Sequence, residues 1–125
     1  PVALLLLLST AQAQTLTASY YSIASLKKEK TWDRTHGLMA NGELFKDSGL
    51  TAACNLFPLG SRVRITSRNN RSVEVTITDR ISKRFGKTRI DLSYEAMRRL
   101  DGCKQGIIPV EVTYVRTVLQ QGVGI

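Results

Sequence analysis

The chain has 125 residues, of which 42% are hydrophobic, so one domain with a sizeable core is expected. Its net charge of +8 points to an anionic partner, such as an acidic polymer or an anionic surface. The basic residues occur in short groups without interleaved aromatic motifs, which argues against nucleic acid as that partner.

The first thirteen residues predict export. Val2 to Leu8 is an apolar run too short to span a bilayer, and Ala11-Gln12-Ala13 is a small-x-small cleavage signature. Residues 1–13 are therefore interpreted as the remnant of a signal peptide. The mature chain is expected to be monomeric and soluble in the periplasm or cell envelope, without stable membrane insertion.

Two cysteines, Cys54 and Cys103, are the only ones in the chain. In an oxidising compartment an even number favours a disulfide, which here would close a loop of about 50 residues and contribute roughly 4 kcal/mol. The alternative is that one of them is a reactive thiol.

Six segments have the composition or alternation of β-strands. They are residues 16–23, 50–54, 62–67, 72–79, 89–92 and 108–118. One helix is expected between Ser93, as its N-cap, and Gly102. These elements predict a mainly β fold, a small six-stranded barrel over residues 14–118 with one short α-helix and a flexible tail at 119–125.

Residues 26–42 have no clean period and contain the single tryptophan and the single histidine, Trp32 and His36. They are expected to form a long loop, and long loops in small domains are often functional.

The segment Ser72–Asp79 carries the clearest pattern. Val73, Val75 and Ile77 alternate with polar residues, and Asp79 falls in phase with the apolar set. A carboxyl at the rim of a core is expected to have a raised pKa. The alternative is an aspartate that ends the strand by accepting backbone N–H bonds in a turn.

Eight short motifs together resemble the RlpA (rare lipoprotein A) family over about residues 17–116. They are Ala18-Ser-Tyr-Tyr21, His36-Gly37, Ala40-Asn-Gly-Glu43, Leu50-Thr-Ala-Ala53, Pro58-Leu-Gly60, Arg71-Ser-Val73, Asp79-Arg80 and Arg89-Ile-Asp-Leu-Ser93, in that order, with Tyr21 closing the first. The resemblance implies a double-psi β-barrel, the fold that this family shares with expansins, barwins and family-45 endoglucanases.

The resemblance also implies a function. Characterised members of the RlpA family are endolytic peptidoglycan transglycosylases, and no metal or cofactor is expected for this chain. An acid protonates the glycosidic oxygen, and the 6-hydroxyl of N-acetylmuramic acid attacks its own anomeric carbon, which leaves a 1,6-anhydro end. Such chemistry needs a carboxyl that stays protonated near neutral pH.

Carried over by position, the catalytic residues are Asp79, as the acid, and Glu43, as its support. The residues expected to bind substrate are Tyr21, Asn41, Cys54, Arg80 and Asp91. Tyr20, Tyr21 and Trp32 are expected to line a sugar groove by stacking on sugar rings, and the alternative for the tyrosine pair is one core residue and one surface residue. Asp91 resembles an aspartate of expansins and endoglucanases, and the alternative for it is capping of the helix that follows.

Cys54 stands where the family has a histidine, and a thiol cannot act as a two-ended hydrogen-bond relay. This departure keeps a second hypothesis open, a non-catalytic, expansin-like barrel that binds glycan without cutting it. A third hypothesis is a thiol hydrolase in which His36 activates Cys54.

Overall fold

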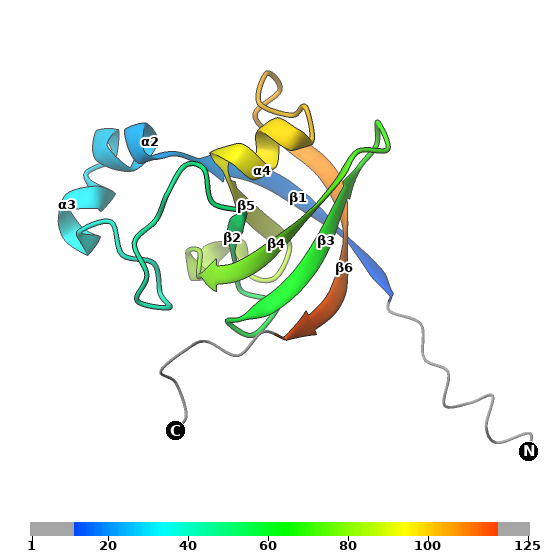
Figure 1. Ribbon diagram of the computed structural model, residues 1–125, viewed down its shortest axis with the longest axis horizontal. Helices are drawn as coiled ribbons and strands as arrows, with labels where there is room; N and C mark the ends of the chain where they lie inside the picture. Colours follow the sequence, from blue (N-terminus) through cyan, green and yellow to red (C-terminus); the bar gives the residue numbers. More distant parts are fainter. Residues whose placement is uncertain (1–11, 118–125) are drawn as a thin grey trace, which may run out of the picture.

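The computed structural model describes residues 12–117, which form a closed barrel of six strands (Figure 1). The strands are β1 Ala13–Tyr21, β2 Thr51–Cys54, β3 Ser61–Ser67, β4 Ser72–Asp79, β5 Arg89–Ser93 and β6 Ile108–Thr117. They neighbour one another in the order β1-β5-β2-β4-β3-β6, and β6 pairs with β1 to close the ring. Two pairs, β1–β5 and β2–β4, are parallel and the others are antiparallel. The predicted six-stranded, mainly β fold is confirmed.

Alternating apolar residues of the strands fill the barrel. Val63 and Ile65 of β3 and Val75 and Ile77 of β4 are fully buried. The same core continues through β5, β6 and the helix after β5, with Ile90, Leu92, Val112, Met97 and Leu100. The period-2 pattern in the sequence thus identifies the inward face of these strands.

The predicted helix is present as α4, Tyr94–Arg99, which lies across one end of the barrel (top in Figure 1). The Ser93 hydroxyl accepts a hydrogen bond from Ala96 N at 3.3 Å and donates one to Gly49 O at 2.6 Å. Ser93 therefore caps the helix, as predicted, and also ties its first turn to the loop before β2.

The long loop expected at residues 26–42 is only partly a loop. Two short helices, α2 Ile23–Lys28 and α3 Thr31–Thr35, lie beside the barrel (left in Figure 1). A capping box between Ser22 and Ser25 starts α2, with Ser25 N donating to Ser22 Oγ at 3.1 Å and Ser22 N to Ser25 Oγ at 2.9 Å. The structure also has a short 3-10 helix, η1 Lys83–Phe85.

A second, smaller apolar cluster packs the segment between β1 and β2 against the outside of the barrel. Its buried members are Tyr21, Met39, Phe45 and Ala53. Ala52 packs in the barrel core, whereas its neighbour Ala53 packs in this outer cluster, so β2 is covered on both faces.

The predicted disulfide is wrong for this structure, in which Cys54 and Cys103 are free thiols. Cys54 lies opposite Ile90 near the start of β5, whereas Cys103 follows α4, which continues from the other end of β5. The barrel therefore separates the two side chains along its strands.

The predicted flexible tail lies outside the described residues, as do residues 1–11 of the predicted signal-peptide remnant. Within residues 12–117, no helix has the length and apolar character that crossing a membrane requires.

Candidate functional site

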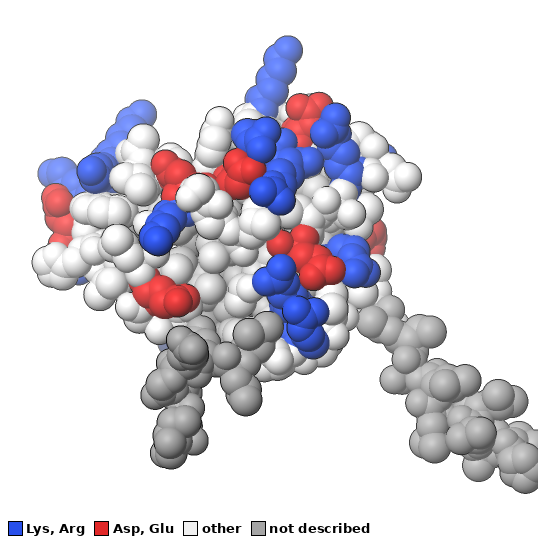
Figure 2. All heavy atoms as spheres, viewed as in Figure 1, with Lys and Arg blue, Asp and Glu red and all other residues white. Residues whose placement is uncertain are grey.

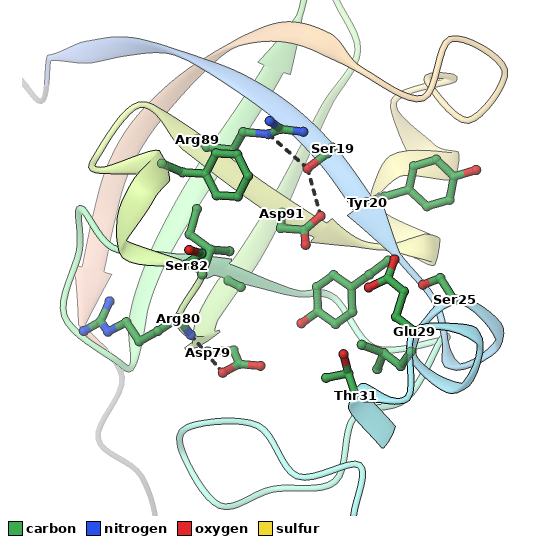
Figure 3. A pocket seen from close by; sticks show the side chains of 15 residues that line it. Ser19, Tyr20, Ser25, Glu29, Thr31, Asp79, Arg80, Ser82, Arg89 and Asp91 are labelled. Atoms are coloured by element: carbon green, nitrogen blue, oxygen red, sulfur yellow. Dashed lines mark hydrogen bonds between the residues drawn. The ribbon is translucent and has the colours of Figure 1, made fainter. Parts of the chain in front are cut away.

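A row of four residues crosses the outer face of four neighbouring strands. Ser19 of β1 is in register with Asp91 of β5, Asp91 with Ala53 of β2, and Ala53 with Asp79 of β4. All four line a groove of about 490 Å³ (Figure 3). Its other walls come from α2 and the residues after it and from the segment that follows β4, through Ser25, Leu26, Glu29, Thr31, Arg80, Ile81, Ser82 and Phe85. The strand register therefore sets two carboxyls on one groove floor, with a single alanine between them.

A register shift in the β2–β4 pair brings Asp79 into this row. Ala52 pairs with Ile77, but Ala53 pairs with Asp79, so Thr78 is passed over. Thr78 is itself buried, and its hydroxyl donates to Met39 Sδ at 3.1 Å. Asp79 therefore lies beside Ala53 at the groove. The alternation predicts instead that Asp79 continues the apolar face of Val73 and Val75, and this prediction is wrong.

The Asp79 carboxyl is half-buried at the end of β4. Its Oδ1 accepts hydrogen bonds from Ala40 N at 2.9 Å and Arg80 N at 2.8 Å. Burial raises the pKa of Asp79 above its usual value, while the two N–H groups and the charge of Arg80 act in the opposite direction. The predicted direction is confirmed, and the backbone bonds of the alternative interpretation are present as well.

Asp91 lies deeper, and its pKa is raised further, to about 6. Burial is the largest cause, and the negative charges of Glu29 and Asp79 add to it. The Ser19 hydroxyl donates to Asp91 Oδ1 at 2.9 Å and, with the charge of Arg89, partly offsets the rise. Because such a carboxyl exists in both protonation states near neutral pH, it has the property of a general acid or base.

Asn41 and Glu43 lie in the turn before β2, outside the groove lining. The Asn41 side chain donates to Glu43 Oε1 at 2.7 Å and accepts from Glu43 N at 2.9 Å. Asn41 N donates to Thr78 O at 3.1 Å, and the neighbouring Ala40 N holds Asp79. The exposed Glu43 carboxylate therefore contacts the turn that orients Asp79, and it does not reach into the groove.

The family model described as a lytic transglycolase matches residues 13–112. The chain belongs to the lytic transglycolase family. The predicted resemblance is confirmed, and the barrel is of the double-psi type.

Relatives of this lytic transglycolase chain carry a peptidoglycan activity in their names. A probable endolytic peptidoglycan transglycosylase RlpA of Nostoc sp. is 45% identical over 74 residues, which are 58% of this chain and 20% of the relative. The endolytic peptidoglycan transglycosylase RlpA of Rickettsia bellii is 38% identical over 86 residues, which are 66% of this chain and 37% of the relative. The chain thus spans a fifth to just over a third of the length of these relatives.

A solved structure shares the fold of the lytic transglycolase barrel. An expansin from Clavibacter michiganensis superposes with a TM-score of 0.60 at 20% identity, over 87% of this chain and 53% of that chain. At this identity the likeness supports the fold alone.

Cys54, which was expected to bind substrate, points into the barrel core and is fully buried. Its Sγ contacts Arg89 O at 3.5 Å, and burial raises the pKa of the thiol. A buried, protonated thiol is a poor nucleophile, and His36 is an exposed residue at the end of α3 that does not line the groove. The thiol-hydrolase hypothesis is therefore wrong.

Arg80, also expected to bind substrate, lines the groove, but one nitrogen of its guanidinium group forms hydrogen bonds within the protein. Its Nη1 donates to Cys54 O and to Phe57 O, both at 2.5 Å. Arg80 thus fastens the end of β2 to the end of β4, next to Asp79.

Sequence reasoning missed four further residues of the groove lining, Ser19, Glu29, Phe85 and Arg89. The Arg89 guanidinium lies 4.7 Å from the Phe85 ring centroid, and its Nε donates to Ser19 Oγ at 3.4 Å. The alternation of buried and less buried residues within each strand could have placed Ser19 and Asp91 on the outer faces of β1 and β5. Only the pairing of β1 with β5 shows that they are neighbours. Among residues 12–117, no group of three or more His, Cys, Asp or Glu has the arrangement of a metal site.

Proposed function

We propose that this chain is a peptidoglycan lytic transglycosylase that cleaves the glycan strand and leaves a 1,6-anhydro-N-acetylmuramic acid end. The proposal draws on the family of the chain and on the activity named for its relatives. The observation that carries it is the pair of half-buried carboxyls, Asp79 and Asp91, on either side of Ala53 in the groove.

The surroundings of the two carboxyls divide the acid and base roles between them. Asp91 is the more buried of the two, and its pKa of about 6 keeps a larger fraction of it protonated near neutral pH than of an ordinary aspartate. We therefore assign to Asp91 the role of the acid that protonates the glycosidic oxygen, in place of Asp79, to which the resemblance assigned it. Asp79 accepts two backbone N–H bonds, which stabilise its carboxylate, so it takes the proton from the attacking 6-hydroxyl. The bond between the anomeric carbon and the leaving oxygen breaks as the bond to the 6-oxygen forms, and no water is consumed.

Glu43 and Asn41 serve this reaction as positioning residues. Their mutual hydrogen bonds hold the turn whose Ala40 N–H binds Asp79. The contacts of Asp79 need no histidine at position 54, because the Cys54 side chain faces the core and the backbone N–H of Ala40 supplies a hydrogen bond to the Asp79 carboxylate.

The same proposal places the chain in the cell envelope, where peptidoglycan is found, with glycan strands as its partner. The apolar run and the cleavage signature at residues 2–13 support export.

A product analysis tests the proposed function. Wild type, Asp91→Asn and Asp79→Asn would be incubated with intact sacculi and with glycan strands stripped of stem peptides, and the products read by mass spectrometry. We expect 1,6-anhydro ends with wild type and a loss of at least 100-fold with either variant, the usual contribution of general acid–base catalysis.

Asp101→Asn is the matched control, because Asp101 is an exposed aspartate after α4 that lies away from the groove lining. Products with reducing ends would indicate hydrolysis instead. Retention of wild type on glycan without any cleavage would contradict the proposal and establish a binding barrel.

A further inference from the structure

The ring of Tyr21 packs against other side chains of the protein. Tyr21 is the last residue of β1, and its ring stacks on Phe45 with centroids 4.5 Å apart and an interplanar angle of 28°. The residue is 9% exposed and belongs to the outer apolar cluster. Because one ring face is covered, the stacking of Tyr21 on a sugar that the sequence suggested is disfavoured, and its hydroxyl is the part that remains to be explained.

The Tyr21 hydroxyl has no hydrogen-bond partner among the described residues, although it is fully buried. Buried tyrosine hydroxyls normally find a partner, since an unpaired one loses its bonds to water without replacement. Tyr21 lines the groove, so a ligand in the groove would lie beside this side chain and could supply the missing acceptor.

The two carboxyls whose charges act on Tyr21 form their hydrogen bonds with other groups. Asp79 accepts from Ala40 N and Arg80 N, and Asp91 accepts from Ser19 Oγ. The charges of both carboxyls act on Tyr21 and, after burial, raise the pKa of its phenol, so the group remains a donor at any physiological pH. The groove therefore contains a fixed, unused O–H donor near its two carboxyls.

We propose that the Tyr21 hydroxyl donates a hydrogen bond to a neutral oxygen of a sugar residue bound between Asp79 and Asp91. A sugar hydroxyl or an acetamido carbonyl suits this position, because an anionic oxygen would be repelled by the two carboxyls and Glu29, which also lines the groove. The inference rests on the proposed function, since it names how that same groove holds its substrate.

Tyr21→Phe separates this role from a structural one. The substitution removes only the unpaired hydroxyl and keeps the ring that packs on Phe45. We expect an unchanged or higher Tm, together with a roughly 3- to 15-fold weaker Kd for a soluble N-acetylglucosamine oligomer in calorimetry, the effect of one neutral hydrogen bond.

Tyr114→Phe is the matched control, because the Tyr114 hydroxyl lies on β6 and pairs with Thr117 Oγ1. It should leave the Kd for the oligomer unchanged. A lower Tm for Tyr21→Phe would mean that the hydroxyl supports the fold, and an unchanged Kd would mean that it does not touch the sugar; either result overturns the inference.

The same titration distinguishes this inference from the proposed function. Oligomer binding by wild type that weakens in Tyr21→Phe, without anhydro products from sacculi, supports the hydroxyl's role and contradicts the transglycosylase. Absence of oligomer binding by wild type overturns the inference, while anhydro products in that case would leave the proposed function standing.

Discussion

Asp91 couples the stability of the barrel to pH. Its pKa rises from 3.8 to about 6 on folding, chiefly because of burial. The folded chain therefore holds this proton more tightly than the unfolded chain. The resulting stabilisation is fully present below about pH 4 and is lost as the pH rises through 6, and it amounts to roughly 3 kcal/mol.

Asp91→Asn should remove this pH dependence while keeping an acceptor for Ser19. We expect the Tm of the variant to be close to that of wild type at pH 4 and several degrees higher at pH 7.5. Melting curves across this range, with Asp101→Asn as control, would measure the difference. An equal Tm difference at both pH values would contradict the raised pKa.

At the level of elements, the strands were predictable and their offsets were not. Val73, Val75 and Ile77 reveal β4 because alternation is a property of one segment. The shift that skips Thr78 depends on the partner strand, so no pattern within β4 could place Asp79 on the groove side. For this reason the sequence identifies the two carboxyls, Asp79 and Asp91, but does not predict that they lie in one row across the sheet.

The helix α2 was missed because its start signal is weak. Its capping box has a serine at the third helical position, where glutamate or glutamine is the usual sign, and α2 spans only Ile23–Lys28. The helix nevertheless supplies a groove wall, through Ser25 and Leu26.

Ser22→Ala should loosen that wall. The change removes the side-chain acceptor for Ser25 N and should cost about 1 kcal/mol. Because α2 ends in Lys27 and Lys28, trypsin can report its opening. We expect several-fold faster cleavage there, with the barrel intact, and a higher KM for glycan strands. Ser48→Ala, at an exposed serine before β2, should be cut at the wild-type rate. Equal cleavage of both variants would argue against the cap.

At the scale of the whole molecule, some of the basic side chains form ion pairs with acidic side chains and others do not. On the face in Figure 2, basic side chains are interspersed with acidic ones. Arg98 and Arg99 pair with Glu95, and Arg62 and Arg64 pair with Glu74. By contrast, the segment after β4 carries Arg80, Lys83, Arg84 and Lys87, which form no ion pair within residues 12–117. A hollow next to the groove is lined by three of these four, together with Asn55, Ile81 and Gly86.

This free charge predicts an electrostatic share in glycan retention. Lys83→Gln with Lys87→Gln should lower retention on anionic sacculi several-fold at low salt, and the difference from wild type should vanish near 1 M salt. Pelleting assays over a salt series would measure it. Arg68→Gln with Lys104→Gln removes the same charge from residues that line neither the groove nor this hollow. An equal loss with that pair would mean that net charge acts without regard to position.

The pairing of β1 with β6 also determines when the chain can fold. These are the first and the last strands, with Ala13 opposite Thr113, and β6 pairs with β3 as well. Until Ile108–Thr117 is available, β1 and β3 each present an unpaired edge, and the sheet remains open. Barrel closure is thus a late, long-range event, and loop-closure entropy makes such events slow. A chain shortened before Ile108 should yield an aggregation-prone open sheet and not a smaller barrel.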